Sequence, residues 1–237
     1  MGDPATELLL EPARRSRRGR ALTSGLVLSA AAYAVGMAHD VASARGLPRV
    51  KPPLLIGMVA LHLAAFARLA RGGPRLPVPG PIRALSGLMF LVGLGGMFYS
   101  IFVEVPLRKA WIDRGHTDEL VTTGTYALVR HPGVLWLSAA IPFGALATRS
   151  CYLLLASPLI ALGDVVHVWF QDRFILPHVF GQAYRDYQEQ TPFVIPNRES
   201  VDRFARTFRG GADIEESPAL EAAEALDAAA RAHATAT

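Results

Sequence analysis

The residues most able to do chemistry stand together in segment 121–136, VTTGTYALVRHPGVLW, where a polar stretch runs into an apolar one. Pro132 suits the first turn of a helix, which places Arg130 and His131 at the helix N-terminus. That end carries partial positive charge and free N–H groups, so the segment predicts a site for a carboxylate or another anion. The same residues also suit a plain membrane-interface cap, with arginine at the headgroups and tyrosine in the aromatic belt.

Ionisable residues inside apolar segments form a second group of candidates. Asp164 and His167 are three residues apart on one face of a predicted helix, and Glu104 lies near the end of another. Such residues within a membrane helix are candidates for function by default. The alternative for Asp164 is a structural contact with Arg149 or Tyr152. The chain has a single cysteine and no H-x-x-x-H pair, so we predict no intrachain disulfide and no metal site.

Long uncharged segments must position these residues. Charged residues are absent from 21–38, 52–67, 84–103, 132–148 and 150–163. A helix needs about 20 mostly apolar residues to cross the hydrocarbon core, and flanking arginines can snorkel to the headgroups where a segment is shorter. We predict an all-α integral membrane protein with about five transmembrane helices, over 21–39, 53–70, 82–105, 132–148 and 151–172. The short connection between the last two predicts a tight antiparallel hairpin.

The composition agrees with a membrane protein whose charges lie in its loops. Hydrophobic residues make up 51% of the chain and charged residues 19%, below the roughly 25% of soluble domains. The net charge of +4 comes from arginine-rich loops, which indicates contact with lipid headgroups rather than with nucleic acid. Membrane lipids are therefore expected partners, and the oligomeric state is left open.

Two motifs carry a resemblance to a known family. The first, TTGTYALVRHP, is followed about 40 residues later by FGQAYRDYQEQTPFVIP. In this order and spacing they resemble the isoprenylcysteine carboxyl methyltransferases and their relatives, the phospholipid N-methyltransferases and membrane thiol methyltransferases. The resemblance covers residues 85–197. The matching residues are Thr122, Gly124, Tyr126, Arg130, His131, Pro132, Phe180, Gly181, Tyr184, Tyr187, Pro192, Ile195 and Pro196.

The resemblance implies a cofactor, S-adenosylmethionine, and a set of site residues. The residues that it places at the cofactor are Gly124, Tyr126, Leu128, Val129, Arg130, His131, Pro132, Tyr184 and Tyr187. The family's acidic pair is altered here, because counting back from Phe180 gives Asp172 followed by Arg173. Asp172 is acidic in either register and is the main catalytic candidate, with Arg173 and Asp164 beside it. Val134 also replaces an aromatic residue of the family pattern.

The implied activity is methyl transfer to a lipophilic or small acceptor that offers a carboxylate, a thiol or an amine. The alternatives are an NADPH-dependent membrane reductase and a non-catalytic protein on the same scaffold. The predicted organisation is a disordered basic N-terminus (1–20), three helices (21–105), a catalytic region with two helices and an amphipathic segment (106–200), and a disordered tail (201–237).

The orientation involves two opposing arguments. The positive-inside rule places the arginines of 14–20 in the cytoplasm, whereas a cofactor made in the cytoplasm requires the C-terminal region to face it. Either the N-terminus lies outside despite its arginines, or one apolar segment does not span. Because the cofactor is made in the cytoplasm, we expect the site to face the cytoplasm.

Overall fold

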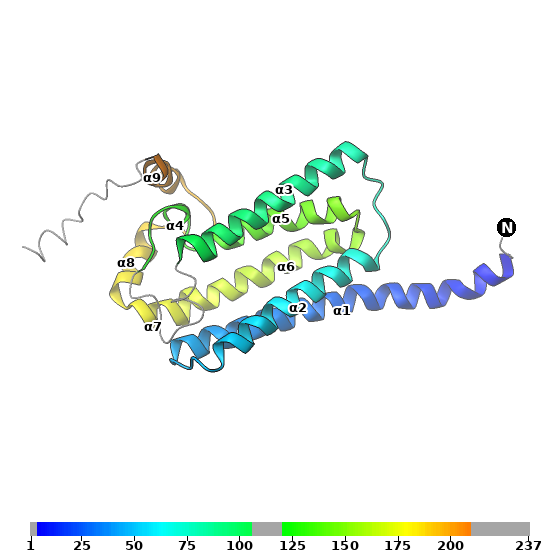
Figure 1. Ribbon diagram of the computed structural model, residues 1–237, viewed down its shortest axis with the longest axis horizontal. Helices are drawn as coiled ribbons and strands as arrows, with labels where there is room; N and C mark the ends of the chain where they lie inside the picture. Colours follow the sequence, from blue (N-terminus) through cyan, green and yellow to red (C-terminus); the bar gives the residue numbers. More distant parts are fainter. Residues whose placement is uncertain (1–3, 106–119, 210–237) are drawn as a thin grey trace, which may run out of the picture.

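A computed structural model describes residues 4–105 and 120–209, and within these ranges the chain is all-helical. Its elements are α1 (Pro4–Ala44), α2 (Lys51–Gly72), α3 (Gly80–Phe98), the π-helical turn η1 (Tyr99–Glu104), α4 (Thr125–Leu128), α5 (Pro132–Thr148), α6 (Cys151–Phe170), the π-helical turn η3 (Gln171–Ile175), α7 (Leu176–Phe180), α8 (Gln182–Gln190) and α9 (Arg198–Arg209). Consecutive long helices run in opposite directions, with α1 packed on α2, α3 on α5, and α6 on α1, α2 and α5 (Figure 1).

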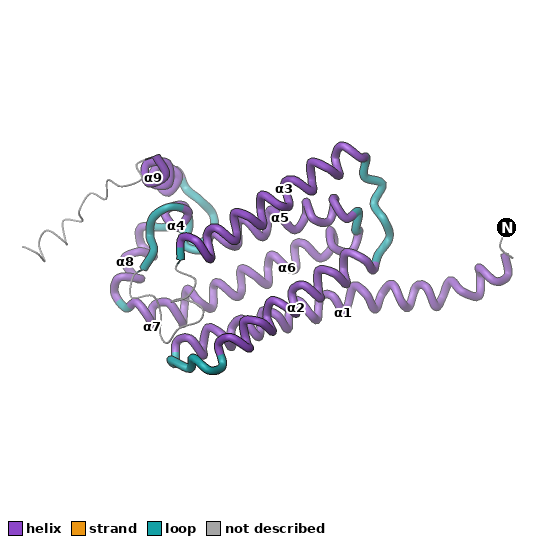
Figure 2. Tube along the Cα trace, in the orientation of Figure 1, coloured by secondary structure: helices purple, strands orange, loops and turns teal. Residues whose placement is uncertain are grey.

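The predicted all-α membrane protein is confirmed. Within residues 4–105 and 120–209, four helical stretches are long and apolar enough to cross a membrane: 19–44, 51–72, 80–104 and 151–180. The fifth predicted segment forms α5, whose 17 residues extend about 25 Å, a little less than the hydrocarbon core. The structure therefore has four full-length candidate spans and one shorter apolar helix within the same bundle (Figure 2).

Small residues make the contacts between helices, and large apolar residues point outward. Ala140 and Ala145 are fully buried, whereas Leu63 and Leu91 are exposed. A Cβ added at Gly93 of α3 would come within 2.7 Å of the Ala140 Cβ. Lipid tails are as apolar as leucine, so membrane helices associate through close contact of this kind.

The predicted hairpin of α5 and α6 is present, and its turn is hydrogen-bonded to the loop that follows α2. Arg149 takes the left-handed conformation, with φ 57°, and ends α5. Ser150 then caps α6 by accepting a hydrogen bond from the Leu153 N–H at 3.1 Å. The Leu76 N–H donates to the Arg149 carbonyl at 2.8 Å, which joins the two connections at this end of the bundle.

Both predicted disordered ends contain helix. α1 already begins at Pro4, because residues 5–20 are rich in Ala, Leu, Glu and Arg, all strong helix formers. α9 extends through 198–209, in the range predicted as tail. It begins with a reciprocal cap in which the Ser200 N–H donates to Asn197 Oδ1 at 2.8 Å and the Asn197 N–H donates to Ser200 Oγ at 3.0 Å. The rest of the predicted tail, 210–237, and residues 106–119 of the predicted catalytic region lie outside the described ranges.

Candidate functional site

Two π-helical turns carry acidic residues to one end of the bundle. The turn η1 ends α3 with Glu104, and the turn η3 follows α6 with Asp172. A π turn interrupts the regular helical register and occurs frequently at functional sites. The short helices α4, α7, α8 and α9 gather at this end, while α1 begins beyond the opposite end (Figure 1). The candidate site is therefore built where the long helices stop.

Asp172 is the centre of a buried hydrogen-bond network. Its side chain is only 11% exposed and accepts two parallel bonds from Arg130, from Nε at 2.8 Å and from Nη2 at 3.0 Å. Tyr184 donates its hydroxyl at 2.6 Å, and Gln188 donates Nε2 at 3.0 Å. His131 Nε2 lies 3.3 Å from the same carboxylate. Bidentate charged bonds of this type are strong and fix geometry, so this carboxylate joins η3 to the loop before α5 and to α8.

Arg130 also hydrogen-bonds to the C-terminal end of α8. Its Nη1 donates to the carbonyls of Gln188 at 2.9 Å and Thr191 at 2.6 Å, so four of its five N–H groups are in use. Its backbone N–H donates to the Pro192 carbonyl at 2.9 Å. The Phe193 ring lies 5.6 Å from the guanidinium carbon and packs edge-on against His131. Among the residues that the structure describes, none accepts from the remaining N–H, on Nη2.

Glu104 organises the other side of the loop. Its carboxylate accepts a hydrogen bond from the Thr125 N–H at 2.8 Å and another from the Thr125 hydroxyl. Ser100 bonds to the same hydroxyl at 3.0 Å and accepts from the Trp136 indole at 3.2 Å. Gly124 precedes this cap with φ 62° and ψ −134°, and a Cβ there would fall onto the Glu104 carboxylate. The glycine therefore permits both the turn and the cap.

Tyr184 and Tyr187 share one face of α8, as their spacing predicts, and both are buried. Tyr184 reaches Asp172, and Tyr187 donates to the Tyr126 carbonyl at 2.7 Å. Burial raises the pKa of Tyr184, with Asp172 adding to the effect, and it raises the pKa of Tyr187 and Tyr126 as well. The three phenols therefore stay neutral at neutral pH, and those of Tyr184 and Tyr187 act as hydrogen-bond donors.

A scan against protein-family models finds no match, and neither do searches of the curated proteins and the solved structures.

The predicted site residues divide into three groups. Arg130, His131, Asp172 and Tyr184 meet in one network. Tyr187 of α8 bonds to one of the remaining loop residues, Tyr126, and all of these precede or follow Arg130 and His131 in the chain: Gly124, Tyr126, Leu128, Val129 and Pro132. Arg173 and Asp164 form the third group, which lies outside the network. Arg173 is exposed, and Asp164 precedes Asp172 in the chain, so that the rise of a helix places it about 12 Å from Asp172.

Sequence reasoning missed Gln188, which bonds both the side chain and the backbone carbonyl of Asp172. The signal was present, because Gln188 lies four residues after Tyr184 and so shares its helical face.

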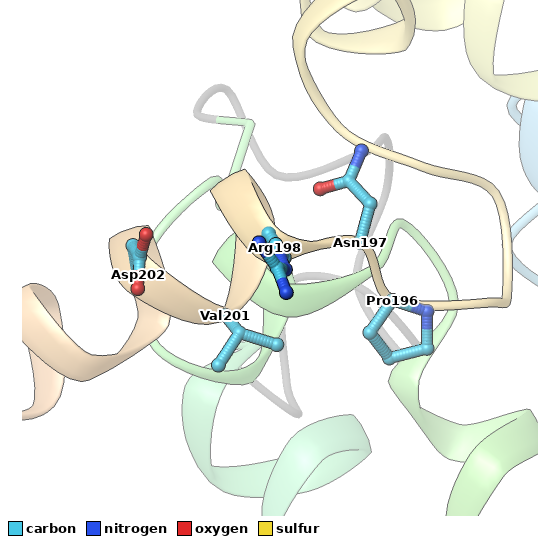
Figure 3. A pocket seen from close by; sticks show the side chains of 5 residues that line it. All are labelled: Pro196, Asn197, Arg198, Val201 and Asp202. Atoms are coloured by element: carbon cyan, nitrogen blue, oxygen red, sulfur yellow. The ribbon is translucent and has the colours of Figure 1, made fainter.

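A surface hollow of about 630 Å³ lies at the start of α9 (Figure 3). Its lining residues are Pro196, Asn197, Arg198, Val201 and Asp202. All five are exposed, and none belongs to the Asp172 network. We therefore place the candidate site at the network rather than at this hollow.

Burial makes His131 sensitive to pH. Desolvation lowers its pKa from the ordinary value of 6.5, and the contact with Asp172 only partly opposes this shift. The folded protein thus keeps His131 neutral where the unfolded chain takes up a proton. Stability from this residue is present above pH 6.5 and is lost as the pH falls towards the folded pKa.

We expect the melting temperature to fall between pH 7 and pH 5, with at most about 1.4 kcal/mol of stability lost per pH unit to this group. The measurement is a melting curve in detergent across that range, on the native protein and on His131→Asn. The slope should be shallower in the variant, and equal slopes would contradict the assignment.

Proposed function

We propose that this protein is a membrane methyltransferase that uses S-adenosylmethionine, acting on a lipophilic or small acceptor. One observation carries the proposal. The two segments that resemble the methyltransferase motifs are separated by residues 133–179, and both hydrogen-bond to the buried carboxylate of Asp172. Arg130 and His131 come from the first motif and Tyr184 from the second. Asp172, the acidic residue between the motifs, joins them. The residue beside it, Arg173, is where the chain departs from the acidic pair of the family pattern.

The residues at this end fit the cofactor's charge. S-adenosylmethionine carries an ammonium, a sulfonium and a carboxylate, so its net charge is positive. The site offers two carboxylates, Asp172 and Glu104, against one guanidinium, Arg130. The Tyr126 and Phe193 rings supply faces for adenine and for the sulfonium. The spare N–H of Arg130 can bond the cofactor's carboxylate.

The chain's own residues have positioning roles in this proposal. The bound cofactor supplies an activated methyl group, and the protein's main task is to align an acceptor and exclude water. Asp172 is saturated with hydrogen bonds, so it orients His131 and Tyr184 rather than accepting a proton itself. His131 is neutral at pH 7 because burial lowers its pKa, which leaves its ring able to contact a cationic cofactor without repulsion.

A thermal-shift titration in detergent tests the proposal. S-adenosylmethionine and S-adenosylhomocysteine should each stabilise the native protein by about 2.7 kcal/mol at 100 times the dissociation constant, a shift of several degrees. His131→Ala should abolish both shifts, and the matched variant His178→Ala, at an exposed histidine of α7, should retain them. A shift with NADPH alone would favour a reductase. Absence of any shift in folded protein would favour a non-catalytic role.

We further propose that the site faces the cytoplasm, where the cofactor is made. The single cysteine, Cys151, begins α6 at the opposite end of the bundle and is half-buried. A membrane-impermeant maleimide should therefore label Cys151 from outside intact cells, with Cys151→Ser as the unlabelled control. Labelling of Cys151 only after the membrane is opened would show that the site faces the outside instead.

A further inference from the structure

A second group of polar side chains lies within the candidate membrane spans, between α1, α2 and α6. Tyr33 and Asp40 come from α1, His62 from α2, and Asp164 and His167 from α6. Gln171 of η3 donates to Asp40 at 2.9 Å and directly precedes Asp172, so this intramembrane cluster adjoins the Asp172 network. None of these five residues belongs to either sequence motif. Polar groups at this depth are costly to keep unless they have a function.

Asp40 and His167 form the fixed part of the cluster. Asp40 is 8% exposed, and its Oδ2 lies 2.8 Å from His167 Nε2 and 2.9 Å from Gln171 Nε2, which donates to it. The carboxylate selects the tautomer of His167 in which Nε2 carries the proton, leaving the Nδ1 lone pair as an acceptor. Among the residues that the structure describes, none hydrogen-bonds to that Nδ1.

Two glycines make room for this arrangement. A Cβ at Gly36 of α1 would lie 2.9 Å from His167 Cε1, and a Cβ at Gly163 of α6 would lie 2.6 Å from the Tyr33 ring. Tyr33 also donates its hydroxyl to the Ile160 carbonyl at 2.9 Å. The rings of His167 and Tyr33 are therefore held against the opposite helix at sites where no larger residue fits.

Asp164 is the unsatisfied member of the cluster. It is half-buried and lies one turn before His167 on the same face of α6. Its carboxylate makes no hydrogen bond or ion pair with another residue in 4–105 or 120–209. A carboxylate at this depth needs a cation or a hydrogen-bond donor from elsewhere.

We propose that Asp164 and His167 bind the ammonium end of a membrane-soluble amine, and that this amine is the methyl acceptor. The two side chains lie one turn apart on α6, and both can accept a hydrogen bond. A carboxylate acceptor would meet repulsion from both Asp40 and Asp164. An amine is one of the acceptor classes that the sequence left open, and this proposal names it. Its catalytic part rests on the proposed function, whereas its binding part does not.

The proton balance uses the Asp40–His167 pair. An ammonium nitrogen has no lone pair, so it first gives one proton to His167 Nδ1, and Asp40 stabilises the resulting imidazolium. The freed lone pair forms the nitrogen–carbon bond while the carbon–sulfur bond of the sulfonium breaks, and that electron pair stays on sulfur. The proton on His167 then passes to water, which restores the neutral ring.

Dodecylamine is a suitable probe, with dodecanoic acid as the control of equal chain length. The amine should raise the melting temperature of the native protein in detergent without any cofactor, and the acid should not. Asp164→Asn should weaken amine binding about tenfold or more, because a charge-assisted bond is lost. The matched variant Ser157→Ala, at a buried serine two turns earlier on α6, should bind the amine as the native protein does.

A second variant and a second ligand separate the possible failures. His167→Gln can still donate to Asp40 but lacks the Nδ1 acceptor, so it should also lose amine binding and keep its response to S-adenosylhomocysteine. Equal amine shifts in the native protein and both variants, or an equal shift with dodecanoic acid, would overturn the amine site. Selective amine binding without any response to the adenosyl ligands would keep the site and remove methyl transfer.

Discussion

Replacing Asp172 by alanine lowers the free energy of unfolding by about 3–5 kcal/mol, because it leaves the Arg130 guanidinium buried without its counter-charge. Both side chains of the pair are only 11% exposed, and Tyr184, Gln188 and His131 lose the same acceptor. Denaturant or thermal unfolding in detergent measures the change.

Asp186→Ala is the matched control for this variant. Asp186 lies on the exposed face of α8 and accepts a bond from Gln182 at 2.8 Å, so its removal should cost about 0–1 kcal/mol. Similar losses in the two variants would mean that the buried network does not hold this end of the bundle. The double variant Arg130→Met with Asp172→Leu should recover part of the stability, since both charges are then removed together while Tyr184 and Gln188 still lack their acceptor.

Gly124→Ala should cause the second large loss in the free energy of unfolding, and Gly181→Ala is its matched control. Both glycines have nearly the same conformation, with φ 62° and ψ −134° at Gly124 and φ 60° and ψ −128° at Gly181. A Cβ at Gly181 meets nothing within 4 Å, whereas one at Gly124 would displace the Glu104 carboxylate. Gly181→Ala should therefore cost about 1–3 kcal/mol from backbone strain alone.

Gly124→Ala should cost more, about 3–5 kcal/mol, because displacement of Glu104 adds to the strain. It should also release the cap on Thr125 and increase amide exchange in α4. Unfolding measurements on the two variants isolate the contribution of the Glu104 contact. Equal losses would show that the cap contributes nothing beyond the turn.

The sequence was sufficient for the long helices because the hydrocarbon core imposes a simple rule on them. Segments without charge had to become helices of sufficient length, and the short connection at 148–151 had to become a hairpin. The spacing of Tyr184 and Tyr187 likewise placed both on one buried face. These features depend on local composition and helical periodicity.

The partners of the charged residues could not be predicted in this way. Arg130 stood at a helix N-terminus in the sequence, which suggested a free cation for a ligand. Its partner Asp172 is 42 residues away and is directed inward by a π turn, a feature that counting at 3.6 residues per turn does not reveal.

Asp40 was missed for a related reason. The predicted first helix ended at residue 39, so Asp40 was assigned to a linker, whereas α1 continues to Ala44 and directs Asp40 towards His167. Helix ends are hard to predict from composition when the last turn is polar yet buried. The contact depends on α6, which follows more than 100 residues later in the chain.

Cross-linking of the cofactor is the most direct test of the central claim. Ultraviolet irradiation of the detergent-purified protein with methyl-labelled S-adenosylmethionine, followed by peptide mapping, locates the binding site without knowledge of the acceptor. We expect the label in peptides from 120–136 or 172–193, its loss in the presence of S-adenosylhomocysteine, and its loss in His131→Ala. Label confined to other peptides, or labelling that S-adenosylhomocysteine does not compete, would contradict the assignment of this end of the bundle as a methyltransferase site.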